Sequence, residues 1–178
     1  ELPNIRVIVV AGGGAVVTAA MSSGKRAICA GPGNPPAVVD ETADIEQAAR
    51  DIVLGSSFDN NIICVEEKEV VVVASVADAL LQAMTHHNAV LIDRSRLPQL
   101  EQTIFTRMAG PRGHAEINRD LIGKNADYIL GKMGMNVPST VKLGVVEVGE
   151  THPLLWTVQM MPILPVTRVP NANYAIDL

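Results

Sequence analysis

Four consecutive valines, at residues 70–73, are the feature that most constrains how this chain can fold. A continuous run of β-branched residues has no polar face, which is typical of a strand buried on both sides of a sheet. The apolar run at residues 5–10 predicts a second buried parallel strand. Strands of this kind need helices to cover both faces, so the sequence predicts an α/β fold.

Apolar strand-like segments alternate with helix-like segments along the chain. The expected strands are residues 5–10, 26–30, 37–39, 69–74, 89–92, 141–148 and 163–169. The expected helices are residues 15–21, 45–53, 76–84, 95–108 and 119–133, with another helix starting near residue 174. This alternation indicates a largely parallel sheet flanked by helices.

The helix after residue 44 has the clearest sequence signal. Asp44 can cap its N-terminus, and Gln47 three residues later completes a capping-box pattern. Gly55 is a plausible C-cap. Apolar residues recur at helical spacing on one face, namely Ile45, Ala48, Ala49, Ile52 and Val53.

Composition narrows the classes of function. Apolar residues make up 48% of the chain, enough for a sizeable core, and the net charge is −5. This mild acidity and the 3% of aromatic residues argue against nucleic-acid and anionic-membrane partners. No apolar run approaches the roughly 20 residues of a membrane helix. The two cysteines, Cys29 and Cys64, suggest neither a disulfide framework nor a metal site, so we expect a soluble cytoplasmic protein.

Three glycines, Gly12 to Gly14, follow the first expected strand and precede the first expected helix. This strand–turn–helix layout is typical of a βα unit. The glycines lack the full G-x-G-x-x-G spacing of a dinucleotide-binding turn, so the motif alone favours a tight turn over a cofactor contact.

Cys64 closes an expected polar loop, residues 56–63, and directly precedes the valine-rich strand region. A loop held between rigid elements is a common place for a catalytic side chain. The thiolate is the reactive form of cysteine. The neighbouring Glu66 and Glu67 oppose its formation, whereas Lys68 favours it. On these residues alone, Cys64 is either a nucleophile or a small buried hydrophobe.

Several segments resemble consecutive motifs of one enzyme family. Residues 31–36 (GPGNPP), 39–44 (VDETAD) and 58–64 (FDNNIIC) resemble the CoA-acylating aldehyde dehydrogenases, and most closely the acetaldehyde and propionaldehyde dehydrogenases of ethanolamine and propanediol utilisation. Residues 152–153 and 160–165 (MMPILP) are similar to the same branch. The resemblance runs in order along essentially the whole chain.

The resemblance implies a covalent mechanism. In this family a cysteine thiolate attacks a small aldehyde, hydride passes to NAD, and coenzyme A cleaves the resulting thioester. The matching nucleophile is Cys64, whose backbone N–H would be one oxyanion donor. The expected partners are a small aldehyde, coenzyme A and, in the longer parent protein, further copies in a homo-oligomer. A bacterial microcompartment is a possible location. The expected NAD contacts are Gly12, Gly13, Ala30 and Gly31.

The resemblance also implies a division of the chain and a truncation. Residues 1–30 correspond to the tail end of the NAD-binding domain, and residues 31–178 correspond to the catalytic domain. Both are truncated relative to the family. The family's second oxyanion donor, an asparagine of the nucleotide-binding portion, lies outside this sequence. We therefore expect a fragment of a longer enzyme, and the isolated fragment is expected to be inactive.

One local feature separates the branches of the family. Hydrolytic aldehyde dehydrogenases carry a glutamate just before a Gly-Gly pair, whereas the matching residues 28–33 contain no carboxylate. Water, with a pKa of about 15.7, needs a base before it can cleave the thioester. A thiol with a pKa of roughly 8.5 needs far less help. The absence of a carboxylate favours coenzyme A as the acceptor of the acyl group. Cys29, which lies in this segment, is interpreted as a packing residue. A hydrolytic enzyme with a relocated base remains the alternative.

Position 158 departs from the family, which usually has a glutamate there that holds the nicotinamide ribose. Val158 cannot accept a hydrogen bond, and Gln159 is one residue out of register. The loss of such a bond typically costs about 0.5–1.5 kcal/mol. The remaining polar candidates are interpreted as structural: His152 at a turn, Asn60 and Asn61 in the loop, and His86, His87 and His114 on the surface.

Overall fold

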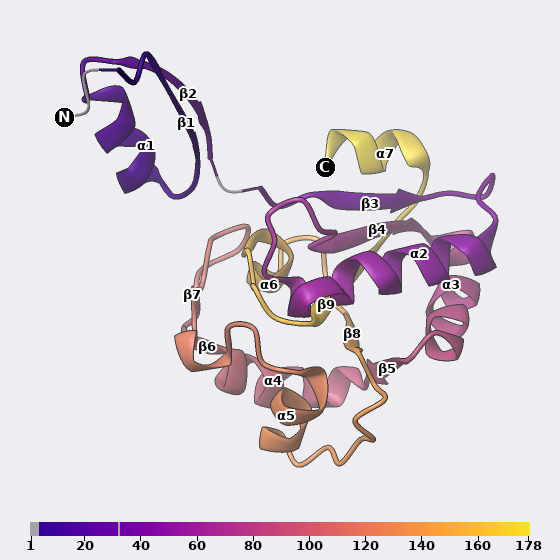
Figure 1. The fold of residues 1–178 in the computed structure, drawn as a ribbon. Coiled ribbons are helices and arrows are strands. Elements are labelled where there is room, and N and C mark those ends of the chain that lie inside the picture. Colours follow the sequence, from indigo (N-terminus) through magenta and orange to yellow (C-terminus); the bar gives the residue numbers. More distant parts are fainter. Residues whose placement is uncertain (1–3, 32) are drawn as a thin grey trace. The chain divides into compact units, whose positions relative to one another are not determined.

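The computed structural model describes residues 4–31 and 33–178 and divides into two compact units, Glu1–Gly33 and Asn34–Leu178. Figure 1 labels their helices and strands. Each unit is described by itself.

The first unit is a single strand–helix–strand element. It contains β1 (Val7–Ala11), α1 (Gly14–Met21) and β2 (Arg26–Ala30), and the two strands pair in parallel. The predicted strand–turn–helix order is therefore confirmed. The prediction of a buried first strand is wrong for this unit, since Val9 is 75% exposed. The single helix α1 covers only one face of the two strands, and alternate residues of both strands stay in contact with solvent.

The second unit is built on a five-stranded parallel sheet. Its strand order is β3-β4-β9-β8-β5, and every pairing is parallel. All five residues of β4 are buried, as the valine run predicts. The strands are β3 (Pro36–Val39), β4 (Glu69–Val73), β5 (Ala89–Ile92), β8 (Leu143–Glu147) and β9 (Ile163–Val169).

Helices cover both faces of this sheet (Figure 1). The side chains of Val70 and Val72 pack in a core with α2 and α3, whereas Val71 and Val73 pack on the opposite face with α7. A further core joins β5, β8 and β9 to α4 and α5. The helices are α2 (Ile45–Ser57), α3 (Ala74–His86), α4 (Leu97–Ile104), α5 (Ala126–Lys132), α6 (Pro153–Trp156) and α7 (Ala172–Asp177).

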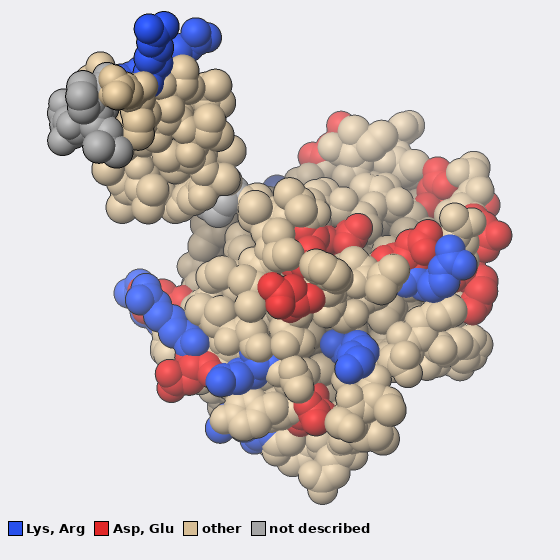
Figure 2. Space-filling view, in the orientation of Figure 1, with Lys and Arg blue, Asp and Glu red and all other residues tan. Residues whose placement is uncertain are grey.

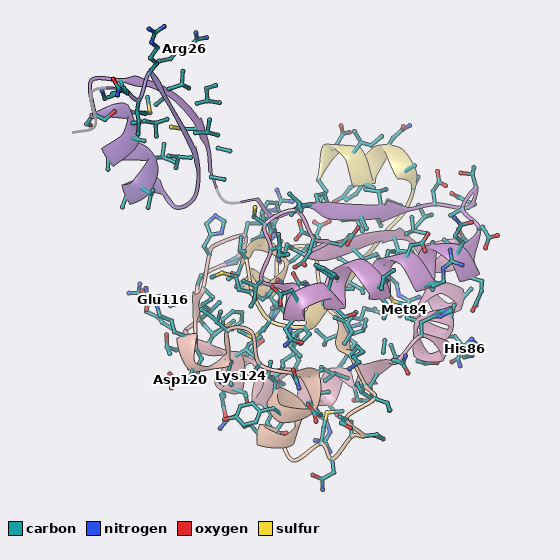
Figure 3. The ribbon with its side chains drawn as sticks, in the orientation of Figure 1. Arg26, Met84, His86, Glu116, Asp120 and Lys124 are labelled. Carbon is teal, nitrogen blue, oxygen red and sulfur yellow. The ribbon has the colours of Figure 1, made fainter. Side chains whose placement is uncertain are left out.

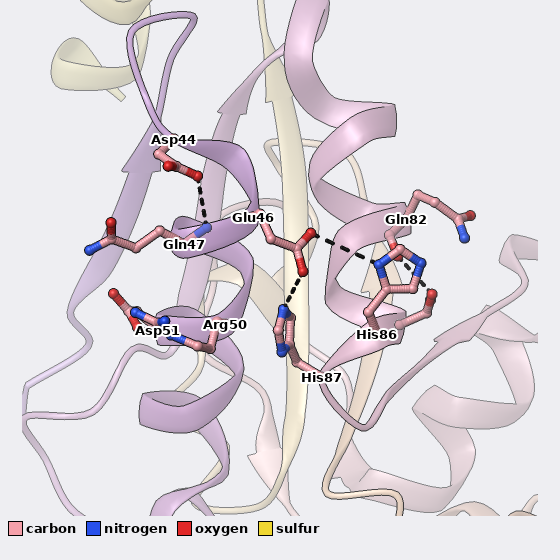
Figure 4. Close-up of polar contacts among 9 residues, drawn as sticks. Asp44, Glu46, Gln47, Arg50, Asp51, Gln82, His86 and His87 are labelled. Atoms are coloured by element: carbon pink, nitrogen blue, oxygen red, sulfur yellow. Dashed lines mark hydrogen bonds and ion pairs between the residues drawn. The ribbon is translucent and has the colours of Figure 1, made fainter.

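The helix α2 confirms its predicted N-terminus and corrects its predicted end. The Asp44 carboxylate accepts a hydrogen bond from the Gln47 N–H at 3.0 Å (Figure 4). Gly55 does not cap the helix, which continues to Ser57. A Cβ atom at Gly55 would lie 2.0 Å from a carboxylate oxygen of Glu67. The glycine leaves room for the Glu67 side chain beside the helix and does not terminate α2.

Two other expected helices are shorter than the sequence predicts. Asp93, and not Ser95, caps the first, which starts as a 3-10 turn, η2 (Arg94–Arg96), and continues as α4. The chain then enters a hairpin of β6 (Phe105–Arg107) and β7 (Glu116–Ile117). The expected helix over residues 119–133 is divided into η3 (Arg119–Leu121) and α5, because Gly123 between them has a left-handed φ of 67°.

Glu46 on α2 links this helix to the C-terminal end of α3. Its carboxylate lies 2.7 Å from His87 Nε2 and 3.9 Å from His86 Nδ1 (Figure 4). His86 is exposed, as Figure 3 also shows, whereas His87 is half-buried. Lys and Arg are interspersed with Asp and Glu on the face of this unit drawn in Figure 2. No helix among the described residues is both long enough and apolar enough to span a bilayer.

Candidate active site

Cys64 lies in an exposed turn between α2 and β4. The Glu66 N–H donates to the Ile63 carbonyl at 3.3 Å, which places Cys64 and Val65 at the middle of the turn. The preceding segment is only in part the polar loop expected over residues 56–63, because Ser56 and Ser57 end α2 and residues 58–61 form the turn η1 (Phe58–Asn61). The thiol is therefore presented to solvent by a short connection with defined ends.

Three successive left-handed residues set the direction of the chain before Cys64. Asp59, Asn60 and Asn61 have φ values of 42°, 54° and 61°. Asparagine and aspartate adopt this conformation more readily than other residues with a side chain. The Asn60 amide donates to the Gly123 carbonyl at 2.9 Å and to Asn125 Oδ1 at 3.0 Å, so the connection is tied to the segment before α5.

A buried lysine connects the two sides of the turn. Lys68 is 0% exposed, and its ammonium donates to the backbone carbonyl of Asn61 at 2.6 Å and also to the Asn61 side-chain oxygen. Its Nζ also lies 3.7 Å from Glu66 Oε2. The Asn61 amide donates in turn to the Glu67 carbonyl at 3.1 Å.

The Glu66 carboxylate completes this arrangement. Its Oε2 accepts a hydrogen bond from the Ile63 N–H at 2.9 Å, directly before Cys64. Burial raises the pKa of the Glu66 carboxyl, although the hydrogen bond from Ile63 and the charge of Lys68 act to lower it. Burial also lowers the pKa of the Lys68 ammonium, whereas the charges of Glu66 and of a Cys64 thiolate act in the opposite direction.

Two further buried polar side chains lie beneath this turn. The Gln159 amide donates to the Lys68 carbonyl at 3.3 Å and to the Leu154 carbonyl at 3.0 Å. Gln159 is 0% exposed, so it does not replace the glutamate that position 158 lacks. Burial raises the pKa of Glu69 to about 8, although the charge of Lys68 and a hydrogen bond with Asn34 oppose this change.

His152 has the structural surroundings that the sequence predicts. Its Nδ1 accepts a hydrogen bond from the Leu154 N–H at 3.1 Å and thereby caps α6. Its Nε2 lies 2.7 Å from Glu101 Oε1. Both ring nitrogens are occupied, so the side chain fixes the turn before Pro153.

The four residues expected to contact NAD lie together in the first unit, whereas Cys64 lies in the second. The Gly12 N–H donates to the Ala30 carbonyl at 3.1 Å, and Gly31 follows directly. A Cβ atom at Gly13 or Gly31 would meet nothing within 4 Å, and none of the three glycines has a left-handed φ. Neither local packing nor φ therefore requires a glycine at Gly13 or Gly31.

The remaining sequence candidates contribute no second site in the described part of the chain. Cys29 lies half-buried in β2, which fits its interpretation as a packing residue. No three His, Cys, Asp or Glu side chains among residues 4–31 and 33–178 are arranged as ligands of a metal ion. The sequence did not predict the burial of Lys68, because residues 66–69 are all charged and such a run is typical of a solvated surface.

Comparison with known proteins shows the family. The family model described as "Aldehyde dehydrogenase family" matches residues 2–178. This chain belongs to the aldehyde dehydrogenase family. It is 48% identical over 156 residues to the acetaldehyde dehydrogenase (acetylating) EutE of Salmonella typhimurium, covering 88% of this chain and 33% of that protein. It is 39% identical to the propanal dehydrogenase (CoA-propanoylating) of the same organism, covering 99% of this chain and 37% of that protein.

Solved structures of aldehyde dehydrogenases have the same fold. A propionaldehyde dehydrogenase from Rhodopseudomonas palustris with bound propionyl-CoA is 44% identical, with a TM-score of 0.89, and the match covers 98% of this chain and 38% of that one. The same enzyme is also known with bound CoA and an acylated cysteine. An engineered glycolyl-CoA reductase with bound NADP+ has a TM-score of 0.89 at 44% identity, with 99% of this chain and 39% of that chain covered.

A third solved relative comes from a fucose utilisation bacterial microcompartment of Clostridium phytofermentans. This propionaldehyde dehydrogenase is 40% identical, with a TM-score of 0.88, and the match covers 99% of this chain and 39% of that chain. The chain thus spans 33% to 39% of the length of each of these relatives. The CoA-acylating enzymes among them are the branch that the sequence motifs indicate.

Proposed function

We propose that this chain carries the catalytic cysteine of an enzyme that converts a short-chain aldehyde, NAD+ and coenzyme A to acyl-CoA, NADH and a proton. The observation that carries the proposal is the exposed Cys64 thiol, held in a turn that is fixed on both sides by buried polar groups. The chain belongs to the aldehyde dehydrogenase family, and two relatives with similar sequences are named as acetylating and CoA-propanoylating dehydrogenases.

The first step uses the Cys64 sulfur. As a thiolate it forms a C–S bond to the aldehyde carbon, and the carbonyl electron pair moves to oxygen. The Cys64 backbone N–H donates to the oxygen that becomes negative. Collapse of this adduct restores the C=O bond and expels a hydride, which leaves an acyl group bound to Cys64 as a thioester.

The hydride needs an acceptor, and the residues of the first unit fit a nicotinamide dinucleotide. When bound, NAD+ would supply the acceptor for this hydride, which consists of one proton and two electrons. Gly13 and Gly31 leave open space where a side chain would project. The hydrogen bond from the Gly12 N–H to the Ala30 carbonyl links the two chain segments that contain these glycines. Backbone without side chains allows close approach of a large ligand. NAD+ is proposed over NADP+, although one solved relative contains NADP+.

Coenzyme A completes the reaction through its thiol. The thiol releases its proton to solvent, its sulfur attacks the acyl carbon, the bond to Cys64 breaks, and the Cys64 thiolate is regenerated. Residues 28–33 contain no carboxylate that could activate water instead. This absence and the bound CoA in the Rhodopseudomonas palustris enzyme both support a thiol acceptor over hydrolysis.

The proposal also covers the location and the oligomeric state of the enzyme. We propose a cytoplasmic homo-oligomer, with a bacterial microcompartment as a possible location, as in the Clostridium phytofermentans relative. The alternative proposal is that the 178 residues act as a folded, non-catalytic piece, because they span only 33% of the length of the acetylating relative. NADH formation by this exact chain at the rate of the full-length protein would rule out the alternative proposal.

Product analysis of the full-length protein tests the function. The purified protein is mixed with propionaldehyde and NAD+, with and without coenzyme A, and products are identified by mass spectrometry. Formation of propionyl-CoA that depends on coenzyme A is expected. Free propionate formed at the same rate without coenzyme A contradicts the proposal and supports a hydrolytic enzyme.

A further inference from the structure

Lys68 is the group beneath the active-site turn that the mechanism above does not use. It is among the largest side chains with no exposed surface. Burying an ammonium is costly unless hydrogen bonds and an opposite charge compensate for the loss of water. A lysine retained at such a place therefore needs partners, and its partners here are concentrated around Cys64.

The contacts of the ammonium bracket the cysteine in the sequence. On one side it binds two oxygens of Asn61, three residues before Cys64. On the other side it lies 3.7 Å from the carboxylate of Glu66, two residues after Cys64. That carboxylate also accepts the hydrogen bond from the Ile63 N–H. Removal of the ammonium would leave oxygens on both sides of the turn without their shared partner.

We propose that Lys68 is a positioning residue of the nucleophile, whose ammonium holds the turn over residues 61–66 together and whose charge acts on the Cys64 sulfur. This inference rests on the proposed function, because it gives Cys64 the role of nucleophile. Lys68 itself does not touch the reacting atoms in this account. It acts through the backbone of the turn and through its charge.

The charges around Lys68 set the direction of the effect. The titratable groups whose negative charges act on its ammonium are Glu66, Cys64 as a thiolate, and Glu69. Because the pKa of Glu69 is raised to about 8, this carboxyl is mostly neutral at pH 7. Glu66 is then the principal negative charge near the ammonium. A positive charge at Lys68 stabilises a thiolate at Cys64, and a negative charge at Glu66 opposes it.

The test measures the reactivity of Cys64 and needs no aldehyde or cofactor. The full-length protein is treated with iodoacetamide at pH 5 to 10, and alkylation of the Cys64 peptide is followed by mass spectrometry. Because the thiolate is the reactive form, the rate against pH reports its population. Cys29, in the other unit, serves as the internal reference thiol.

Two variants are expected to move this profile in opposite directions. Lys68→Met keeps a long side chain without the charge, so alkylation of Cys64 at pH 7 should fall by about three- to tenfold, and the profile should move to higher pH. Glu66→Gln keeps an oxygen for the Ile63 N–H but removes the negative charge. Its alkylation at pH 7 should rise by about two- to threefold. Lys124→Met, an exposed lysine, is the matched control and should change nothing.

A merely structural lysine would not give shifts of opposite sign. The proposal is overturned if Lys68→Met leaves the profile of Cys64 unchanged, or if both variants move it in the same direction. If circular dichroism shows that Lys68→Met does not fold, the double variant Lys68→Met/Glu66→Gln, which removes both buried charges, is compared with Glu66→Gln. A profile at higher pH in the double variant supports the proposal, and coincident profiles overturn it. Failure of the proposed function would appear separately, as acyl-CoA formation that persists in Cys64→Ala.

Discussion

The turn that carries Cys64 and the glycine turn after β1 are constructed in opposite ways. The Cys64 turn follows three left-handed residues and is held by the side chains of Asn61, Glu66 and Lys68. The glycine turn has no left-handed residue, and a Cβ atom at Gly13 would contact nothing. One turn is held by buried polar side chains beside the exposed Cys64 thiol, and the other leaves its backbone uncovered, which fits the proposed contact with NAD+.

The largest expected effect is the loss of Cys64. In the full-length protein, Cys64→Ala should reduce acyl-CoA formation by on the order of 10⁴-fold or more, because the covalent intermediate cannot form. The other free cysteine provides the control. Cys29→Ser should retain acyl-CoA formation within about twofold, and a loss as large as that of Cys64→Ala would contradict the assignment.

A smaller effect is expected when the support of the Cys64 turn is removed. Asn61→Ala introduces a left-handed alanine, which costs about 1–2 kcal/mol, and removes a partner of the Lys68 ammonium, which costs about 1–3 kcal/mol. Asn61→Gly removes the same partner without the backbone penalty. Urea unfolding should therefore rank the wild type above Asn61→Gly and Asn61→Gly above Asn61→Ala. Equal stability of all three would contradict the described geometry.

The proton on Glu69 gives the second unit a pH-dependent stability. Its pKa is about 8 in the folded chain against 4.5 for an ordinary glutamate, so the folded state binds more protons between these values. The contribution of Glu69 to the free energy of unfolding is fully present below pH 4.5. This contribution should fall by about 1 kcal/mol per pH unit as the pH rises from 4.5 towards 8. Thermal unfolding of Glu69→Gln should lack this decline. Glu41→Gln, at an exposed position, is the control and should keep the decline. If Glu69→Gln showed the same decline as Glu41→Gln, the pH dependence would belong to another group.

The smallest expected effect concerns the glycine turn. Gly13→Ala adds a methyl group where the fold has open space, so the melting temperature should fall only slightly, through the weaker N-cap of α1. If the cofactor approaches this backbone, the KM for NAD+ should rise by about three- to tenfold, equal to about 0.7–1.4 kcal/mol.

Gly24, in the same unit, is the contrasting position. Its φ of 72° makes Gly24→Ala destabilising without an effect on the KM for NAD+. If the KM were unchanged in Gly13→Ala, the two turns would not differ in the way proposed.

The accuracy of the sequence predictions differs between these regions for physical reasons. The valine run predicts β4 correctly because its burial on both faces is a local property of residues 70–73. The end of α2 was predicted incorrectly because glycine is a frequent but not an obligatory C-cap, and here the helix continues past Gly55 to Ser57. The helix expected over residues 95–108 ends at Ile104, where the chain pairs with β7 instead.

The candidate site was predictable only in part. The motif at residues 58–64 identifies Cys64 through its resemblance to the family, and the structure adds that the thiol is exposed. The burial of Lys68 could not be read from the sequence, because a lysine among three glutamates at residues 66–69 resembles a solvated surface. The ammonium is buried only because Asn61 and Glu66 supply its partners.

Direct observation of the acylated cysteine is the measurement that tests the central claim most directly. The full-length protein is incubated with propionaldehyde and NAD+ in the absence of coenzyme A, quenched in acid, digested and analysed by mass spectrometry. A propionyl group on the Cys64 peptide that disappears when coenzyme A is added is the predicted result. An acyl group on another residue, or propionyl-CoA formation in a variant that lacks the Cys64 thiol, would contradict the account.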